Sequence, residues 1–221
     1  MPDTTITFLV ENRTLQPELG TEHGLAVLIE RHGRSVLFDT GASPMLVRNA
    51  EVLGADLSGL SAVVLSHGHY DHTGGLDAVL EVAPGEAPVH AHPAATAPKY
   101  AVSAGGEPRE IGFRGGPEAA GRLKLSREPV EVVPGVRTTG QVPRVTTFED
   151  TGGPFFLDPG GLEPDPLFDD QSLLVEAAGG HVLIAGCAHS GIVNTLRHAR
   201  DLAGGGRFLA VLGGMHLAAA S

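Results

Sequence analysis

The sequence predicts a layered α/β or α+β domain, and three observations support this prediction. Of its 221 residues, 42% are apolar and 19% are charged, which suits a globular domain with a hydrophobic core and argues against disorder. Its first third runs in the order strand, strand, helix, strand. The run Ala-Val-Val-Leu at 62–65 is wholly apolar, as is typical of a strand that is buried on both faces.

Short apolar runs separated by turns predict the elements near both ends of the chain. We expect strands at 5–10, 25–30, 35–38, 62–65, 172–177, 181–185 and 208–212, and helices at 45–53 and 190–203. The strands 25–30 and 35–38 form a hairpin, since His32-Gly33-Arg34 between them is a turn sequence. Pro44 and Gly54 are the start and stop signals of the first helix. The strand at 208–212 is expected to be buried.

The middle of the chain differs from both ends. Ten of the 16 prolines lie between Pro98 and Pro166, together with many glycines, so this stretch should consist of short strands and loops. It has no long apolar helix or set of strands that could form a separate core. We therefore predict one domain over residues 1–221, in which 98–166 forms a rim or cover over a site.

Composition also limits the function. The 26 acidic residues exceed the 15 Lys and Arg residues, giving a net charge of −11, so the chain is a poor candidate for binding nucleic acid or anionic membranes. No apolar run approaches the roughly 18–20 residues that span a bilayer, and Met1–Thr4 lacks the features of a signal peptide. The single cysteine, Cys187, excludes an internal disulfide. We expect a cytoplasmic protein with a small-molecule substrate; a homo-oligomer is compatible with the sequence.

The segment Ser-His-Gly-His-Tyr-Asp-His at 66–72 contains the strongest functional signal, directly after the expected buried strand. His67 and His69 are two residues apart, so in an extended segment both rings leave on one side and can bind one metal. Asp71 and His72 are adjacent, cannot point the same way, and suit a second ion. A lone histidine is usually structural or exposed, but four ligand-type residues at this spacing predict a metal site. The donors fit zinc, and iron or manganese less well.

His67-x-His69-x-Asp71-His72 resembles the signature loop of the metallo-β-lactamase superfamily, and Phe38-Asp39-Thr40-Gly41 resembles its upstream aspartate motif, whose carboxylate orients that loop. The resemblance covers most of the chain. Four further segments resemble the branch labelled dihydropterin ribofuranosylaminobenzene phosphate synthase-like: EHGL at 22–25, SHGHYDHTGGL at 66–76, AGCAHSGIVNTL at 185–196 and GGMHL at 213–217.

This resemblance implies an α+β fold, a four-layer αββα sandwich with the metal site at one end of the paired sheets. It also implies a binuclear, usually zinc, hydrolytic centre. The family pattern adds to the loop a third histidine for the first metal, a bridging carboxylate and a distant histidine for the second metal.

The sequence departs from that pattern at Cys187, where many relatives have aspartate. Cys187 either replaces the bridging aspartate, which would favour zinc, or is a small buried apolar side chain. His189, at a strand-to-helix turn, is the third histidine or a proton shuttle. His216 matches the late histidine of the second metal. Because relatives would continue for longer after this histidine, either the chain is a shortened version or another segment or partner completes the site.

Other residues are weaker candidates. The pair Asp169-Asp170 could supply a carboxylate, but acidic pairs in loops are more often solvated. His23 is expected to approach the cleft from the first hairpin and to hydrogen-bond a substrate. His92 would at most support the metal ligands without binding the metal itself. Five basic residues of the middle region could face an anionic ligand but are more simply surface charges: Lys99, Arg109, Arg114, Arg122 and Lys124.

The leading hypothesis is a zinc-dependent hydrolase that uses a metal-bound hydroxide on a small molecule. Asp71 would ligate a metal and accept the proton of the attacking water, while His189 or His23 would stabilise negative charge or protonate the leaving group. Gly74-Gly75 at a helix N-terminus could receive a phosphate oxygen, which favours a phosphorylated substrate.

Three alternatives remain. One is a synthase acting on a pterin or ribosyl phosphate, as the branch label suggests. Another is a metal-loaded binding protein without turnover. The third is a cysteine nucleophile, Cys187, activated by His189.

Overall fold

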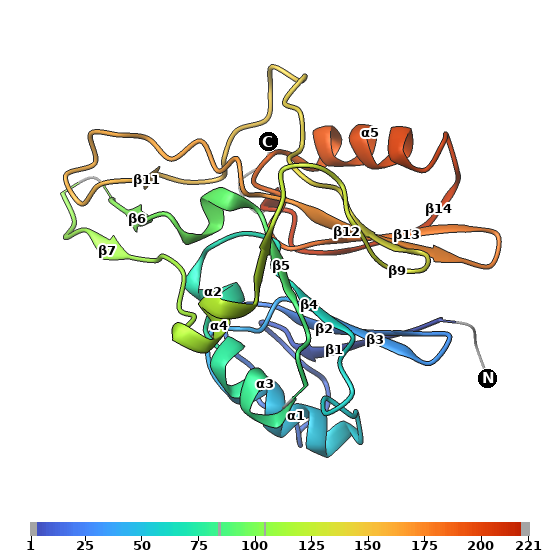
Figure 1. Ribbon diagram of the computed structural model, residues 1–221. Helices are drawn as coiled ribbons and strands as arrows, with labels where there is room; N and C mark the ends of the chain where they lie inside the picture. Colours follow the sequence, from blue (N-terminus) through green and yellow to red (C-terminus); the bar gives the residue numbers. More distant parts are fainter. Residues whose placement is uncertain (1–3, 84, 104, 218–221) are drawn as a thin grey trace.

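The computed structural model of the protein describes residues 4–83, 85–103 and 105–217. Two large β-sheets face each other (Figure 1). The first has the strand order β1-β2-β3-β4-β5-β8. Its strands are β1 (Thr4–Val10), β2 (Ala26–Arg31), β3 (Arg34–Phe38), β4 (Ala62–Val64), β5 (Val89–Ala91) and β8 (Leu123–Leu125). The β1-β2-β3 part is antiparallel, and the β3-β4-β5-β8 part is parallel.

The second sheet has the order β14-β13-β12-β10-β9, with β13 and β14 parallel and the other pairs antiparallel. Its strands are β9 (Glu131–Val133), β10 (Val136–Thr138), β12 (Ser172–Ala177), β13 (Gly180–Ala185) and β14 (Phe208–Gly213). Strand β14 was expected to be buried, and this was wrong. Among the described strands it pairs only with β13, so it is an edge strand, and its residues are half-buried or exposed.

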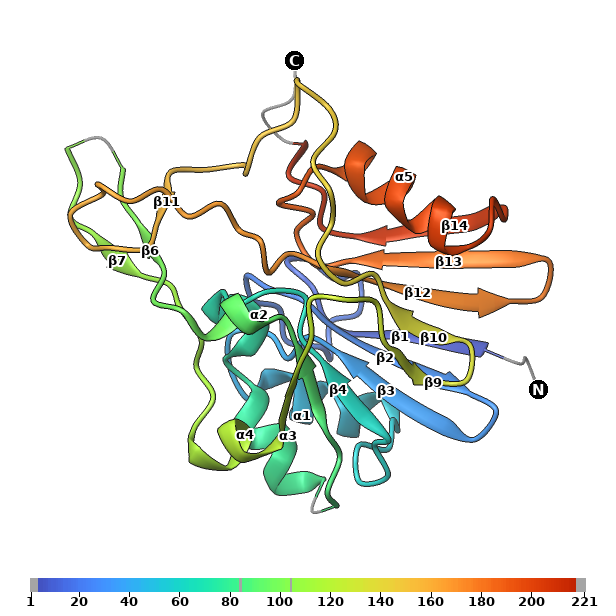
Figure 2. The ribbon, with the colours of Figure 1, turned by 45° about the horizontal axis from the view of Figure 1, so that its top comes forward.

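A third, small sheet comes from the proline-rich middle of the chain. Its order is β11-β6-β7, and its strands are β6 (Tyr100–Ala101), β7 (Arg109–Glu110) and β11 (Phe155–Phe156). It projects to one side of the two large sheets (Figure 2). Strands β8, β9 and β10 come from the same middle region but belong to the large sheets, so this region contributes to all three sheets.

Helices cover the outer faces of both large sheets (Figure 1). These helices are α1 (Met45–Leu53), α3 (Leu76–Val82), α4 (Pro117–Arg122) and α5 (Ile192–Leu202). The short helix α2 (Tyr70–Thr73) and the 3-10 turn η1 (Pro93–Thr96) lie in the segments that follow β4 and β5. Residues of α1, α3 and α4 form one core with the first sheet, and α5 packs on the second sheet. A further core lies between the sheets. The layers are therefore helix, sheet, sheet, helix, which confirms the αββα sandwich.

Strand β2 shows why the layers form. Its wholly buried residues alternate between two cores: Ala26 and Leu28 face the helices, while Val27 and Ile29 face the second sheet. Successive side chains of a strand point to opposite faces, so an unbroken apolar run needs cover on both sides.

Loops at one end of the two large sheets bring the candidate residues together. Asp39 follows β3, the histidine loop follows β4, and Cys187 lies just after β13. Gln171, next to β12, ties the two halves: its side-chain amide donates to the Leu65 carbonyl at 2.9 Å and its backbone N–H to the Ser66 carbonyl at 2.9 Å. Among the helices described, none has the length and apolar character to cross a membrane.

Leu28→Ala should lower the free energy of unfolding by about 2–5 kcal/mol, because it leaves a cavity in a fully buried position between sheet and helices. Leu15→Ala is the matched control: Leu15 is fully exposed, so its truncation should change stability by no more than about 0.5 kcal/mol. Urea unfolding measures both. Equal effects would contradict the assignment of this core.

Candidate metal centre

The site begins with Asp39, whose carboxylate is completely buried directly after β3. Its Oδ1 accepts the backbone N–H of Ser66 at 2.7 Å, and its Oδ2 accepts the Ser66 hydroxyl at 2.7 Å and lies 2.6 Å from Nδ1 of His72. Asp39 has a positive φ of 58°, a strained conformation for a non-glycine residue. The carboxylate thus holds both ends of the histidine loop, as the family resemblance implied.

Ser66 sets the protonation of His67. Because its hydroxyl donates to Asp39, its oxygen can accept the Nδ1–H of His67, which lies 2.8 Å away. The Nε2 of His67 then carries a free lone pair. Burial, helped by nearby His72, holds the pKa of His67 well below its ordinary value, so the ring is neutral at pH 7.

Three buried imidazoles converge on one point. The donor nitrogens of His67, His69 and His189 lie within 4.8 Å of one another, and the Nε2 of each ring has no hydrogen-bond partner among the described residues. Burial, with neighbouring His189, lowers the pKa of His69 to about 2. Orphaned buried polar atoms are rare and call for an explanation. Imidazole nitrogens that face one another at this spacing fit a divalent cation, and zinc in particular.

His189 comes from the other half of the molecule, beyond β13. Its Nδ1 donates to the carbonyl of Thr151 at 2.7 Å, which turns Nε2 toward the cluster. Phe155 of β11 packs against both His69 and His189, with ring centroids 4.9 and 5.3 Å away. Burial would lower the pKa of His189, but Cys187 and Asp170 raise it above the ordinary value. Of the two roles predicted for His189, its position favours that of third histidine.

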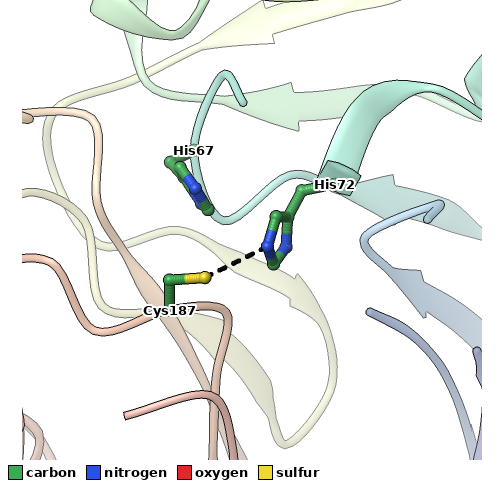
Figure 3. Close-up of side chains that lie close together, drawn as sticks. All are labelled: His67, His72 and Cys187. Carbon is green, nitrogen blue, oxygen red and sulfur yellow. Dashed lines mark hydrogen bonds between the residues drawn. The ribbon is translucent and has the colours of Figure 1, made fainter. Parts of the chain in front are cut away.

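Cys187 lies between two of the groups that could hold metal. Its Sγ is 3.2 Å from Nε2 of His72 (Figure 3), and it forms close clusters with His67 and His72 and with His189 and His216. Burial would raise the pKa of the thiol, but the charge of His72 outweighs it and holds the pKa well below its ordinary value. The thiolate is the form that binds metal. This environment fits a ligand better than a small apolar side chain.

Asp71 and His23 lie at the outer edge of the cluster. Oδ2 of Asp71 is 3.4 Å from Nε2 of His72 and 3.2 Å from Nε2 of His23, whose side chain is 72% exposed. Burial would raise the pKa of Asp71, but His72 and His23 hold it well below its ordinary value. Both residues line a cavity of about 100 Å³ beside Cys187. His23 thus approaches the site from the loop before β2, as predicted.

His216 follows β14, is exposed, and its ring centroid lies 4.6 Å from that of His189. It joins the cluster at the Cys187 side. The structure therefore brings together all seven predicted ligands, although their roles as ligands remain predictions: His67, His69, Asp71, His72, Cys187, His189 and His216.

Two glycines allow the loops to approach so closely. A Cβ on Gly68 would lie 1.9 Å from the Ala95 carbonyl oxygen, and one on Gly186 would lie 2.1 Å from Oγ of Ser66. Both contacts are far shorter than packing allows, so only glycine fits. The space beside Gly68 is therefore filled by the backbone of Ala95 and is not open for an ion.

Three expectations about charged residues were wrong. Lys99 is fully buried rather than a surface charge; its Nζ lies 2.7 Å from Asp165 and 3.0 Å from Asp169. Asp169 and Asp170 are buried rather than solvated. Oδ2 of Asp169 accepts the Gly68 N–H at 2.8 Å, and Asp170 accepts the Ser190 N–H at 2.8 Å, so both carboxylates support loops of the site.

Two other candidates lie outside the cluster. His92 is buried, caps η1 by accepting the Ala94 N–H at 3.0 Å, and lies 3.3 Å from Gln141. The N–H of Gly74 donates to the carbonyl oxygens of Gly41 and Tyr70, each at 2.8 Å, so it is not available for a phosphate. This removes the Gly74 N–H as a phosphate donor, and a phosphorylated substrate stays a prediction.

Sequence reasoning also missed three supporting residues. Ser66 could have been found, since a hydroxyl next to the first histidine can set its tautomer. Nothing in the sequence indicates that the Thr151 carbonyl or the ring of Phe155 reaches the histidines, because both come from irregular segments far along the chain.

The comparisons with known proteins agree with this geometry. The sequence model of the metallo-beta-lactamase superfamily matches residues 19–207. The chain is 32% identical over 213 residues to the 7,8-dihydropterin-6-methyl-4-(beta-D-ribofuranosyl)-aminobenzene-5'-phosphate synthase of Methanocaldococcus jannaschii. The alignment covers 89% of this chain and 71% of the synthase.

Solved structures show the same fold. The crystal structure of Tm1679, described as a metal-dependent hydrolase of the beta-lactamase superfamily, superposes with a TM-score of 0.79 at 32% identity, covering 98% of this chain and 78% of that one. The Rm3 metallo-beta-lactamase gives a TM-score of 0.52 at 16% identity over 91% of this chain and 76% of that one, a likeness in fold alone.

Ser66→Ala should weaken zinc binding about 10- to 100-fold, because it removes the group that orients His67 from behind. Competition with a chromogenic chelator measures the affinity. Ser58→Ala, an exposed serine away from the site, is the control and should bind zinc as the wild type does. Unchanged zinc affinity in Ser66→Ala would contradict the assigned role.

Proposed function

The chain belongs to the metallo-β-lactamase superfamily, as its motifs predicted, and we propose that it is a zinc-dependent hydrolase of a small molecule. One observation carries the proposal: three buried imidazoles present unpartnered Nε2 atoms to one another beside a cysteine whose thiolate is stabilised. This donor set is the one that zinc prefers. The structure of Tm1679, a relative described as a metal-dependent hydrolase, supports the same reading.

His67, His69 and His189 would hold one zinc ion. Cys187, His72, Asp71 and His216 would hold a second, with Cys187 at the position where many relatives have aspartate. Zinc bound there lowers the pKa of water and stabilises negative charge on an attacked oxygen.

The residues at the cavity would handle protons. Asp71, whose carboxylate is kept ionised, can accept the proton of an attacking water at Oδ2. His23 lies 3.2 Å from the same oxygen and is mostly exposed, so it can pass that proton to a leaving group or to solvent.

The cavity limits the substrate. Its lining includes the acids Glu11 and Asp71 and four glycines, and no Lys or Arg belongs to the described lining. Backbone can therefore approach a substrate closely at this position.

A second candidate is a synthase reaction on a pterin or ribosyl phosphate. The 32% identity to the synthase of Methanocaldococcus jannaschii favours it. The His and Cys donor cluster and the likeness to Tm1679, described as a metal-dependent hydrolase, favour the hydrolase as the preferred function.

Elemental analysis of the purified protein should give close to two zinc ions per chain, and a panel of lactones and a chromogenic phosphodiester should reveal hydrolysis. His69→Ala should lose bound zinc and turnover together, since it removes one of three converging nitrogens. His92→Ala, a buried histidine outside the cluster, should keep both. Full zinc occupancy with no turnover on any substrate would instead favour a binding protein.

Cys187→Ser separates metal ligation from covalent catalysis. If Cys187 is a ligand, as proposed, the serine variant should bind zinc more weakly and lose activity as a consequence, with partial recovery at high zinc concentration. Stopped turnover at full zinc content would instead indicate a cysteine nucleophile. Zinc titration with parallel activity measurements distinguishes the two.

A further inference from the structure

A buried ionic cluster contacts the histidine loop, and none of its residues lines the cavity beside Cys187. Lys99 is 1% exposed, and its ammonium contacts the carboxylates of Asp165 and Asp169, which are 4% and 0% exposed. A lysine is almost never fully buried unless it is paired, and burying three charges is costly. None of these three groups belongs to the metal cluster, so a different role must explain them.

The contacts of Asp169 lead directly to the metal loop. One oxygen, Oδ1, is held by Lys99 at 3.0 Å, and the other, Oδ2, accepts the N–H of Gly68 at 2.8 Å. Gly68 lies between His67 and His69, two of the three converging imidazoles. The carboxylate therefore holds the His67–Gly68 peptide, one of the two peptide groups that join these histidines.

A second chain of contacts joins the same segment to the loop. The carbonyl of Lys99 accepts the N–H of Ile111 at 2.9 Å, and the carbonyl of Ile111 accepts the N–H of Tyr70 at 2.9 Å. Tyr70 directly follows His69. The segment around Lys99 thus supports the loop at both sides of His69, through its side chain at Gly68 and through its backbone at Tyr70.

We infer that Lys99 is a positioning residue for the metal centre: by holding Asp169 in place, it fixes the Gly68 peptide and with it the rings of His67 and His69. The inference rests on the proposed metal site. Asp165 has a different task, because its second oxygen accepts the N–H of Leu167 at 2.8 Å and does not touch the loop. This difference supplies a matched control.

The test compares Lys99→Met with Asp165→Asn, both of which disrupt the same buried cluster. Lys99→Met should weaken zinc binding about 10- to 100-fold, the usual effect of losing a supporting residue behind a ligand, and should change the visible spectrum of the Co²⁺-substituted protein. Asp165→Asn should lower the melting temperature of the metal-free protein but leave zinc affinity and the Co²⁺ spectrum as in the wild type.

Lys99→Arg should restore most of the zinc affinity, because it keeps a cation beside Asp169. Should Lys99→Met fail to fold, Lys99→Gln and Asp169→Asn carry the same expectation of weaker zinc binding. Wild-type affinity in these variants, or a loss in Asp165→Asn as large as in Lys99→Met, would overturn the inference while the proposed function stands. A wild-type protein that binds no zinc would overturn both.

Discussion

The buried carboxylate of Asp39 is the interaction on which the site depends. Removing a charge from water costs free energy unless the charge is paired and hydrogen-bonded. Here the backbone N–H and hydroxyl of Ser66 and the ring of His72 satisfy both oxygens. Since Ser66 precedes the first histidine and His72 is the last, one buried group fixes the two ends of the loop. The family's aspartate motif can therefore be recognised in the sequence and is also needed to hold the histidine loop in place.

The candidate metal centre lies on the seam between the two sheets. The loop after β4 supplies His67 and His69, while the loop after β13 supplies Cys187 and His189. Gln171 and the core between the sheets hold the halves together. The geometry of the donors therefore depends on how two packed halves meet, which a close-packed interior determines within narrow limits.

The same arrangement is costly when no metal is bound. The Nε2 atoms of His67, His69 and His189 lie together in the interior without a partner among the described residues. The buried carboxylates of Asp169 and Asp170 support the loops around them. Metal binding would satisfy these nitrogens, so its free energy would also stabilise the fold. Such local conflict with stability is expected at functional sites.

The sequence by itself determined the fold class, most of the element positions and the seven clustered residues. Short apolar runs indicate which segments are buried, and the spacing of residues in the histidine loop indicates which side chains can bind one metal. The family motifs added the layer order and the ligand candidates Cys187, His189 and His216. Only the tertiary structure decided the environment of charges and of supporting residues: Lys99 and Asp169 read as surface residues, and β14 read as buried. The burial of Lys99 and Asp169 depends on neighbours more than 60 residues away in the sequence, and the partial exposure of β14 depends on its edge position in the sheet. Local sequence contains no information about such contacts.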